Sequence, residues 1–244
     1  MSRHALWWAL TVSLLPALLP LAWHTRRTAV RLPVAQGEAH GITGEAFTAE
    51  PLRLLLIGES TVAGVGVTHL DQALAACLAS ALAAHLQRPV SWRAFGENGI
   101  TAVQACERLL PQALDEPADL ALLVFGVNDT THLTSSARWQ ASMATMATAL
   151  AERGARVAFS AVPPLQHFHA LPWLLRMLMG WRARLLDGEL QVLAARLRAQ
   201  HCALDLRFET QYLAEDGYHP SALGYRQWAE GLAAHVSRLL PPLR

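Results

Sequence analysis

The chain has 244 residues, enough for one α/β domain with a single buried core and short for two domains. Its formal net charge is +1 and 16% of its residues are charged, so no basic field exists to hold a nucleic-acid backbone. The three cysteines, Cys77, Cys106 and Cys202, are odd in number and widely spaced. This pattern argues against a disulfide framework and against a cysteine metal site.

An uncharged apolar run from Ala5 to Trp23 dominates the first 27 residues. As one helix it would be about 28 Å long, which matches the hydrocarbon core of a bilayer. No small-x-small cleavage site follows the run, so an uncleaved membrane anchor is favoured over a signal peptide that is removed on export. A helix packed on the domain is the third alternative. Arg26, Arg27 and Arg31 outnumber Arg3, which favours a cytoplasmic position for the chain that follows the apolar run.

The remainder of the chain divides into a linker or strap over residues 28–50 and a folded domain over residues 51–244. Short apolar runs in the domain alternate with longer amphipathic ones, which predicts βα units and a parallel sheet. The predicted strands are Leu52–Ile57, Val90–Phe95, Leu120–Phe125, Val157–Val162 and Ala203–Leu206. The predicted helices are Leu70–Leu86, Ala102–Leu114, Ala137–Arg153, Arg182–Gln200 and Ala222–Leu240. The expected fold is a three-layer α/β/α sandwich around a mostly parallel five-stranded sheet.

Polar residues follow the first three predicted strands and precede the last helix. They are Gly58-Glu59-Ser60, Gly96 to Thr101, Gly126 to Asp129, and Asp216 to Pro220. In an open α/β sheet the chemistry gathers at the carboxyl ends of the strands. We therefore expect these four loops to face one site.

The residues Ser60, Asp216 and His219 have the chemistry of a catalytic triad. A serine hydroxyl needs a base to take its proton, and that base needs a third group to fix its tautomer. The Asp-x-x-His spacing lets Asp216 hold one imidazole nitrogen of His219 while the other faces Ser60. Pro220 is expected to open the final helix at its first position.

An acyl-transfer intermediate also needs hydrogen-bond donors for its oxyanion. The candidates are the backbone N–H groups of Ser60 and Gly99 and the side-chain amide of Asn128. Gly99 suits the role because a residue without Cβ lets the backbone approach a ligand closely. Gly96 is a nearby rival for the same contact.

These four blocks resemble those of the SGNH, or GDSL-like, hydrolase superfamily. The Gly-x-Asn-Asp block is intact at Gly126–Asp129 and the Asp-x-x-His-Pro block at Asp216–Pro220, whereas Glu59 and Ala94 stand where many members have Asp and Asn. The resemblance implies the flavodoxin-like SGNH fold and an esterase, lipase, lysophospholipase or thioesterase activity. It also allows acyl transfer to a sugar or alcohol, and a member that binds its ligand without turnover is the third possibility.

The segment from Leu171 to Trp181 is almost wholly apolar and leaves the fourth predicted strand at the same sheet edge. We expect it to form a flap in which Trp173, Leu175 and Leu178 receive the apolar acyl chain of an ester or lipid substrate, with ordinary core packing as the alternative. Outside the Asp-x-x-His block, carboxylate or cysteine partners at ligand spacing are lacking for His132, His167, His169, His201 and His235. The expected mechanism therefore uses no metal and no cofactor.

Overall fold

The computed structural model describes residues 3–204 and 208–240. Its centre is a mixed sheet with strand order β1-β3-β2-β4-β5-β6. The five parallel strands are β2 (Leu52–Gly58), β3 (Val90–Gly96), β4 (Leu120–Val124), β5 (Arg156–Ser160) and β6 (Gln200–Cys202). Strand β1 (His40–Thr43) pairs antiparallel with β3 at one edge.

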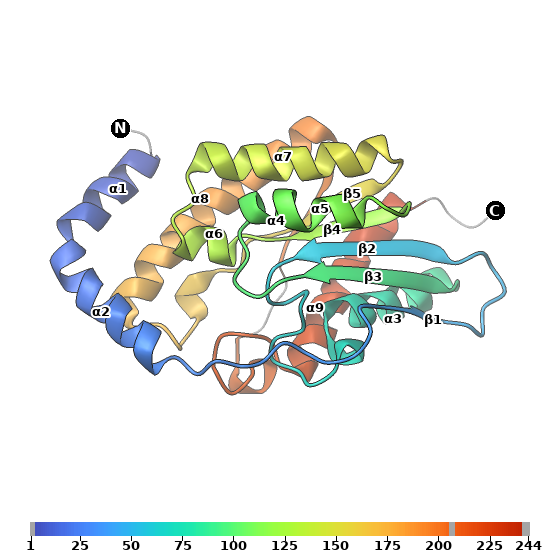
Figure 1. The fold of residues 1–244 in the computed structure, drawn as a ribbon, viewed down its shortest axis with the longest axis horizontal. Helices are drawn as coiled ribbons and strands as arrows, with labels where there is room; N and C mark the ends of the chain where they lie inside the picture. The colour runs from blue at the N-terminus through green and yellow to red at the C-terminus, as the bar shows by residue number, and fades with distance from the viewer. Residues whose placement is uncertain (1–2, 205–207, 241–244) are drawn as a thin grey trace.

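Helices cover both faces of this sheet (Figure 1). One face carries α3 (Leu74–Leu86) and α9 (Ala222–Val236), and the other carries α4 (Ala102–Arg108), α5 (Leu110–Ala113), α7 (Ser136–Glu152) and α8 (Trp173–Leu197). A single-turn helix, α6 (Val127–Thr131), follows β4 directly. Short 3₁₀ turns occupy Leu70–Gln72, Leu165–His167, Thr210–Tyr212 and Ser237–Leu239.

The apolar runs of the strands divide between two cores because successive side chains point to opposite faces. In β2, Leu55 and Ile57 face the core under α7 and α8, whereas Leu54 and Leu56 face the core under α3 and α9. All four side chains are almost fully buried. A sheet covered on both faces needs continuous apolar strands, and this explains the runs in the sequence.

The predicted three-layer sandwich is confirmed, with two corrections to its sheet. The segment expected to be a linker contributes β1, which adds a sixth strand with the opposite direction. This edge strand pairs with one neighbour and its four side chains are exposed or half-buried, so they carry no apolar run. The last strand is Gln200–Cys202 instead of Ala203–Leu206, of which residues 205–206 lie outside the described part.

The expectation of one continuous helix from Ala5 to Trp23 is wrong. The segment forms α1 (Arg3–Ser13) and α2 (Leu15–Thr28), which meet at an angle of 81°. Pro16 lies in the first turn of α2, where proline starts a helix but cannot continue the preceding one. Within residues 3–204 and 208–240 no single helix is long and apolar enough to span a membrane, although this bent pair passes that test jointly.

Gly96 tests the packing beside the loop that follows β2, and Gly188 in α8 serves as its control. A Cβ on Gly96 would lie 2.3 Å from the backbone nitrogen of Ala63, whereas one on Gly188 in α8 would meet nothing within 4 Å. We expect Gly96→Ala to lower the free energy of unfolding by about 1–3 kcal/mol, because the clash is with backbone. Gly188→Ala should raise it by about 0.5–1 kcal/mol, because alanine favours the helix. Urea titration measures both, and equal effects would contradict the described packing.

Candidate active site

The three predicted triad residues form a continuous hydrogen-bonded chain with His219 in the middle. Ser60 follows the end of β2, and its Oγ lies 3.0 Å from Nε2 of His219. The Nδ1 of His219 lies 2.6 Å from Oδ2 of Asp216. The order hydroxyl, imidazole, carboxylate is the arrangement that lets a serine lose its proton to a base during attack.

A tight turn fixes the carboxylate end of this chain. The Oδ1 atom of Asp216 accepts the backbone N–H groups of Tyr218 and His219, each at 3.0 Å. Burial raises the pKa of Asp216, but the hydrogen bonds from the His219 side chain and from these backbone groups outweigh it and leave the pKa below its usual value. The charged form of Asp216 is therefore available to orient the imidazole and to stabilise its cation.

Helix α9 holds the histidine turn against the nucleophile loop. Its N-cap is Ser221, whose side chain accepts the N–H of Gly224 at 3.2 Å. Pro220 precedes this cap, so the expectation that it opens the helix at its first position is wrong. One turn into the helix, the buried hydroxyl of Tyr225 donates to the carbonyl of Val65 at 2.6 Å. The loop after Ser60 and the start of α9 are thus joined directly.

Glu59 connects the nucleophile loop to the Gly-x-Asn-Asp loop, a role that the sequence did not reveal. The two oxygens of its buried carboxyl group accept the backbone N–H of Val127 at 2.9 Å and that of Asn128 at 2.8 Å, at the N-terminus of α6. Burial raises the pKa of Glu59 to about 8, while the two N–H groups act in the opposite direction. The residue before Ser60 therefore holds the backbone of Asn128 in position.

Asn128 and Asp129 in turn fasten the Gly-x-Asn-Asp loop to the loop after β3. The side-chain amide of Asn128 donates to the carbonyl of Ile100 at 3.0 Å, and Asp129 accepts the N–H of Ala102 at 3.0 Å. Asp129 is fully buried, and this burial raises its pKa. Because an amide nitrogen has two hydrogens, Asn128 keeps a second donor for a ligand.

The two candidate glycines of the second loop have different surroundings. Gly99 has a φ of +84°, and a Cβ built on it meets nothing within 4 Å. Gly96 is packed against the backbone of Val62 and Ala63, as noted above. Gly99 directly precedes Ile100, whose carbonyl binds Asn128. Open space beside Gly99 and its nearness to Asn128 favour it over Gly96 as the donor for an oxyanion.

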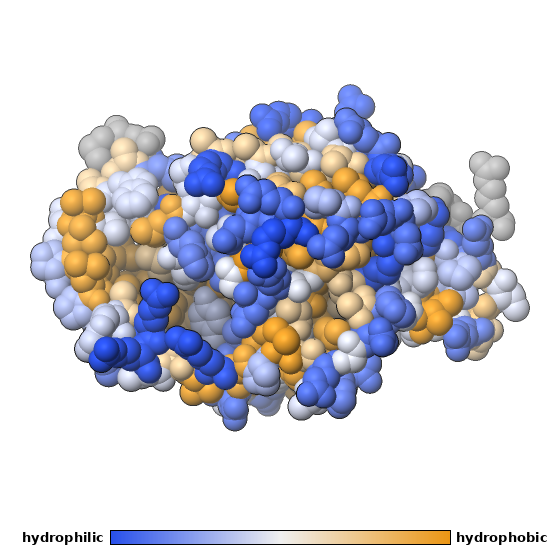
Figure 2. Space-filling model, viewed as in Figure 1, coloured by the Kyte–Doolittle hydropathy of each residue, from blue (hydrophilic) through white to orange (hydrophobic). Residues whose placement is uncertain are grey.

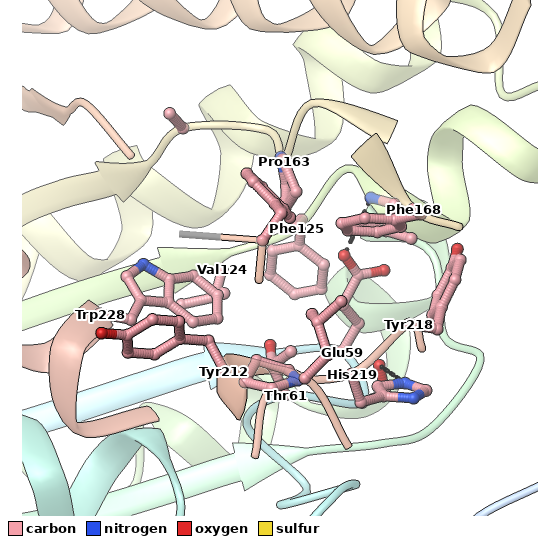
Figure 3. Close-up of a pocket in the computed structure, with 16 residues that line it drawn as sticks. Glu59, Thr61, Val124, Phe125, Pro163, Phe168, Tyr212, Tyr218, His219 and Trp228 are labelled. Carbon is pink, nitrogen blue, oxygen red and sulfur yellow. Dashed lines mark hydrogen bonds between the residues drawn. The ribbon is translucent and has the colours of Figure 1, made fainter. Parts of the chain in front are cut away.

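An apolar pocket of about 30 Å³ adjoins Ser60 and His219 (Figure 3). The sheet edge supplies Val124 and Phe125, and α9 supplies Trp228. Further aromatic residues, which sequence reasoning did not single out, come from the loops around it: Phe168, Phe208, Tyr212 and Tyr218. Phe168 lies between two of the others, with ring centroids 4.8 Å from Tyr218 and 5.8 Å from Phe208. The sequence marks these residues only weakly, through the closeness of Tyr212 and Tyr218 to the Asp216–Pro220 block.

The three residues expected to form an apolar flap lie elsewhere. Leu175 and Leu178 are 8% and 4% exposed because they pack against Leu18 of α2, and Trp173 is 67% exposed. None of the three lines the pocket. Most of the segment belongs to the first part of α8, which begins at Trp173. It is apolar because this part of α8 packs against α1 and α2. Among the residues with described positions, no cluster of His, Cys, Asp or Glu has the composition to hold a metal ion.

The sheet topology and this constellation of loops define an α/β protein with the side-chain set of a serine hydrolase. Residues 56–227 match the model of the GDSL-like Lipase/Acylhydrolase family, and the chain belongs to this family. The resemblance predicted from the sequence blocks is thereby confirmed. No curated protein sequence matches the chain.

Solved structures share the fold at low sequence identity. A lipase/acylhydrolase from Enterococcus faecalis is 20% identical with a TM-score of 0.62, and covers 79% of this chain and 99% of its own. The protein TesA gives the same identity and TM-score, with coverage of 77% and 99%. The psychrotrophic esterase EstA from Pseudoalteromonas sp. is 14% identical with a TM-score of 0.62, and covers 77% and 97%. These likenesses establish the fold.

Glu59→Gln tests whether the buried carboxylate positions the third loop. An amide keeps one acceptor but turns a donor toward the second N–H, so α6 and Asn128 should shift and kcat for an ester should fall by up to about 10²-fold.

The pH dependence of the free energy of unfolding is a second readout of the same substitution. Because the folded pKa of about 8 lies above the ordinary value of 4.5, wild-type stability should fall as pH rises through this window, and Glu59→Gln should lack that fall.

The matched control for this prediction is Glu97→Gln, which removes a nearby carboxylate that is paired with Arg108 at 2.8 Å on the surface. It should leave both kcat and the pH dependence of urea unfolding close to wild type. If Glu59→Gln and wild type show parallel stability curves from pH 5 to 9, the carboxylate of Glu59 is not the group described.

Proposed function

We propose that this chain is a serine ester hydrolase in which Ser60, His219 and Asp216 form the catalytic triad. The observation that carries the proposal is the continuous hydrogen-bonded chain from Ser60 Oγ through His219 to Asp216. A protein that only binds a ligand has no need for a serine aligned with a base and a charged carboxylate. Membership of a family of lipases and acylhydrolases supports the same reading.

In the proposed mechanism Ser60 Oγ attacks the carbonyl carbon of the ester while Nε2 of His219 takes its proton. Asp216 stabilises the imidazolium, and the N–H groups of Ser60 and Gly99 with the amide of Asn128 bind the oxyanion. His219 then protonates the departing alcohol, which leaves an acyl group on Ser60. A water molecule, deprotonated by His219, attacks this acyl group, and the acid is released with Ser60 regenerated.

The aromatic pocket beside Ser60 is the proposed site for an apolar acyl group. Its walls are mainly carbon, and it lies directly against the reacting hydroxyl. Burial of apolar surface gives roughly 0.8 kcal/mol per methylene, so even a narrow pocket selects acyl chains by length. The substrate class supported by the site is therefore a carboxylic ester with a short to medium apolar acyl chain.

Substitutions in the triad test the proposed chemistry. Ser60→Ala and His219→Ala should each abolish hydrolysis of p-nitrophenyl esters while the domain stays folded, because the triad acts as a unit. Asn128→Ala should reduce kcat by about 10²–10³-fold through loss of one oxyanion donor. Its control is Asn98→Ala, an exposed asparagine on the neighbouring loop, which should behave as wild type. Turnover by folded Ser60→Ala at the wild-type rate would end the proposal.

Phe208→Ala tests the pocket as the acyl site. Phe208 lines the pocket and stacks on His167 with ring centroids 5.1 Å apart. Its truncation lengthens the space available, so the ratio of kcat/KM for octanoyl over acetyl esters should rise on the order of tenfold. Trp173→Ala, at an exposed position outside the pocket, is the control and should leave this ratio unchanged. An unchanged ratio in Phe208→Ala would place the acyl chain elsewhere.

A further inference from the structure

The helix pair α1 and α2 presents an exposed apolar surface, which we name the outer face. It consists of Leu6, Leu10, Val12, Leu15, Leu19 and Trp23, each at least 39% exposed. Figure 2 shows an orange, hydrophobic strip at the left end of the molecule, where α1 and α2 lie in Figure 1. Large exposed apolar patches on folded proteins mark sites of contact with another apolar surface.

The opposite side of the helix pair is fixed to the catalytic domain. Trp7 is fully buried and donates its indole N–H to the carbonyl of Leu178 at 2.9 Å. The guanidinium of Arg182, itself 1% exposed, lies 4.8 Å from the centre of the Trp7 ring. His4 adds a contact of 2.7 Å with Glu189. The outer face is therefore held in a set orientation, because the helices beneath it belong to the packed structure.

Positive charge accompanies this apolar surface. The first 37 residues contain four arginines and no aspartate or glutamate. The guanidinium of Arg27 lies 4.0 Å from the centre of the Trp23 ring, at the end of α2 where Arg26 also lies. Tryptophan and arginine at the border of an apolar strip suit the boundary between acyl chains and anionic headgroups.

We propose that the outer face docks on an anionic lipid membrane, with α1 and α2 lying in the interfacial region instead of crossing the bilayer. The helices contain 11 and 14 residues, or about 16 and 21 Å, and each falls short of the ~30 Å hydrocarbon core. Their bend of 81° prevents them from acting as one straight span. A monotopic contact needs only an apolar face and a basic border, and both are present.

This contact would bring the ester pocket to the lipid. In Figure 1 the carboxyl ends of β2 and β3 point toward the end of the molecule where α1 and α2 lie. Helix α8, which carries both N-terminal helices, also contacts α6, the helix that contains Asn128. The substrate would then be an ester held at a membrane surface, a step that rests on the proposed function, whereas membrane binding itself does not.

Vesicle flotation of the full-length chain tests the docking. Wild type should float with vesicles of phosphatidylcholine and phosphatidylglycerol. The double substitution Leu19→Ser with Trp23→Ser should weaken partitioning at least tenfold, because it removes two side chains that insert into lipid. Val192→Ser is the matched control, since Val192 is 71% exposed toward the other end of α8 and should not affect binding. Circular dichroism and melting temperature should stay at wild-type values in all variants, independently of any esterase activity.

Two further arms separate the charge contribution and the mode of binding. Arg26→Gln with Arg27→Gln should weaken binding to anionic vesicles by about fivefold per arginine and leave binding to pure phosphatidylcholine unchanged. An N-terminal epitope tag should remain open to protease added outside sealed vesicles. A protected tag would show that the pair crosses the bilayer and would overturn the proposal.

Three other results would also overturn it. One is wild-type protein that floats with neither type of vesicle. Another is equal flotation of the Leu19→Ser, Trp23→Ser variant and Val192→Ser. The last is a wild-type protein that binds no vesicles and sediments as a dimer, and that the same double substitution converts to a monomer. This result would assign the outer face to a second copy of the chain.

Discussion

A chain of hydrogen bonds that starts from the buried side chain of Glu59, at the carboxyl edge of the sheet, determines how the site is assembled. Glu59 accepts the N–H groups of Val127 and Asn128, Asn128 donates to Ile100, and the neighbouring Asp129 accepts from Ala102. These contacts join the loops that follow β2, β3 and β4. A buried carboxyl group is costly unless its oxygens are hydrogen-bonded, so its partners are restricted to positions that satisfy it.

The consequence for chemistry is that the proposed nucleophile and the candidate oxyanion donors belong to one unit. Ser60 follows Glu59 in the chain, and Gly99 precedes Ile100. The hydrogen bonds of Glu59 and Ile100 therefore also fix the positions of the proposed reacting groups. The histidine comes from a separate element and is fastened by the Asp216 turn and by the bond from Tyr225 to Val65. Preorganised donors of this kind need little rearrangement during reaction, which is how enzymes stabilise developing charge.

The features that could be predicted from the sequence are those with a local or periodic signal. The continuous apolar strands predict the sheet, and the Asp-x-x-His spacing predicts the contact between Asp216 and His219. The role of Glu59 could not be predicted, because its partners are 68 and 69 residues away and depend on how two loops meet. For the segment from Leu171 to Trp181 the structure shows packing, the alternative to the expected flap, and the sequence could not separate the two. Apolar side chains that pack on α2 and those that would receive a ligand look alike in sequence.

The most direct test of the account is covalent labelling with a fluorophosphonate, followed by intact mass and peptide mapping. The account predicts one phosphonyl group per chain, located on the peptide that contains Ser60. Labelling should be absent in Ser60→Ala and strongly slowed in His219→Ala, because the hydroxyl needs its base to attack phosphorus. Label on another residue, or esterase activity in a chain that resists the reagent, would contradict the assignment of Ser60 as the nucleophile.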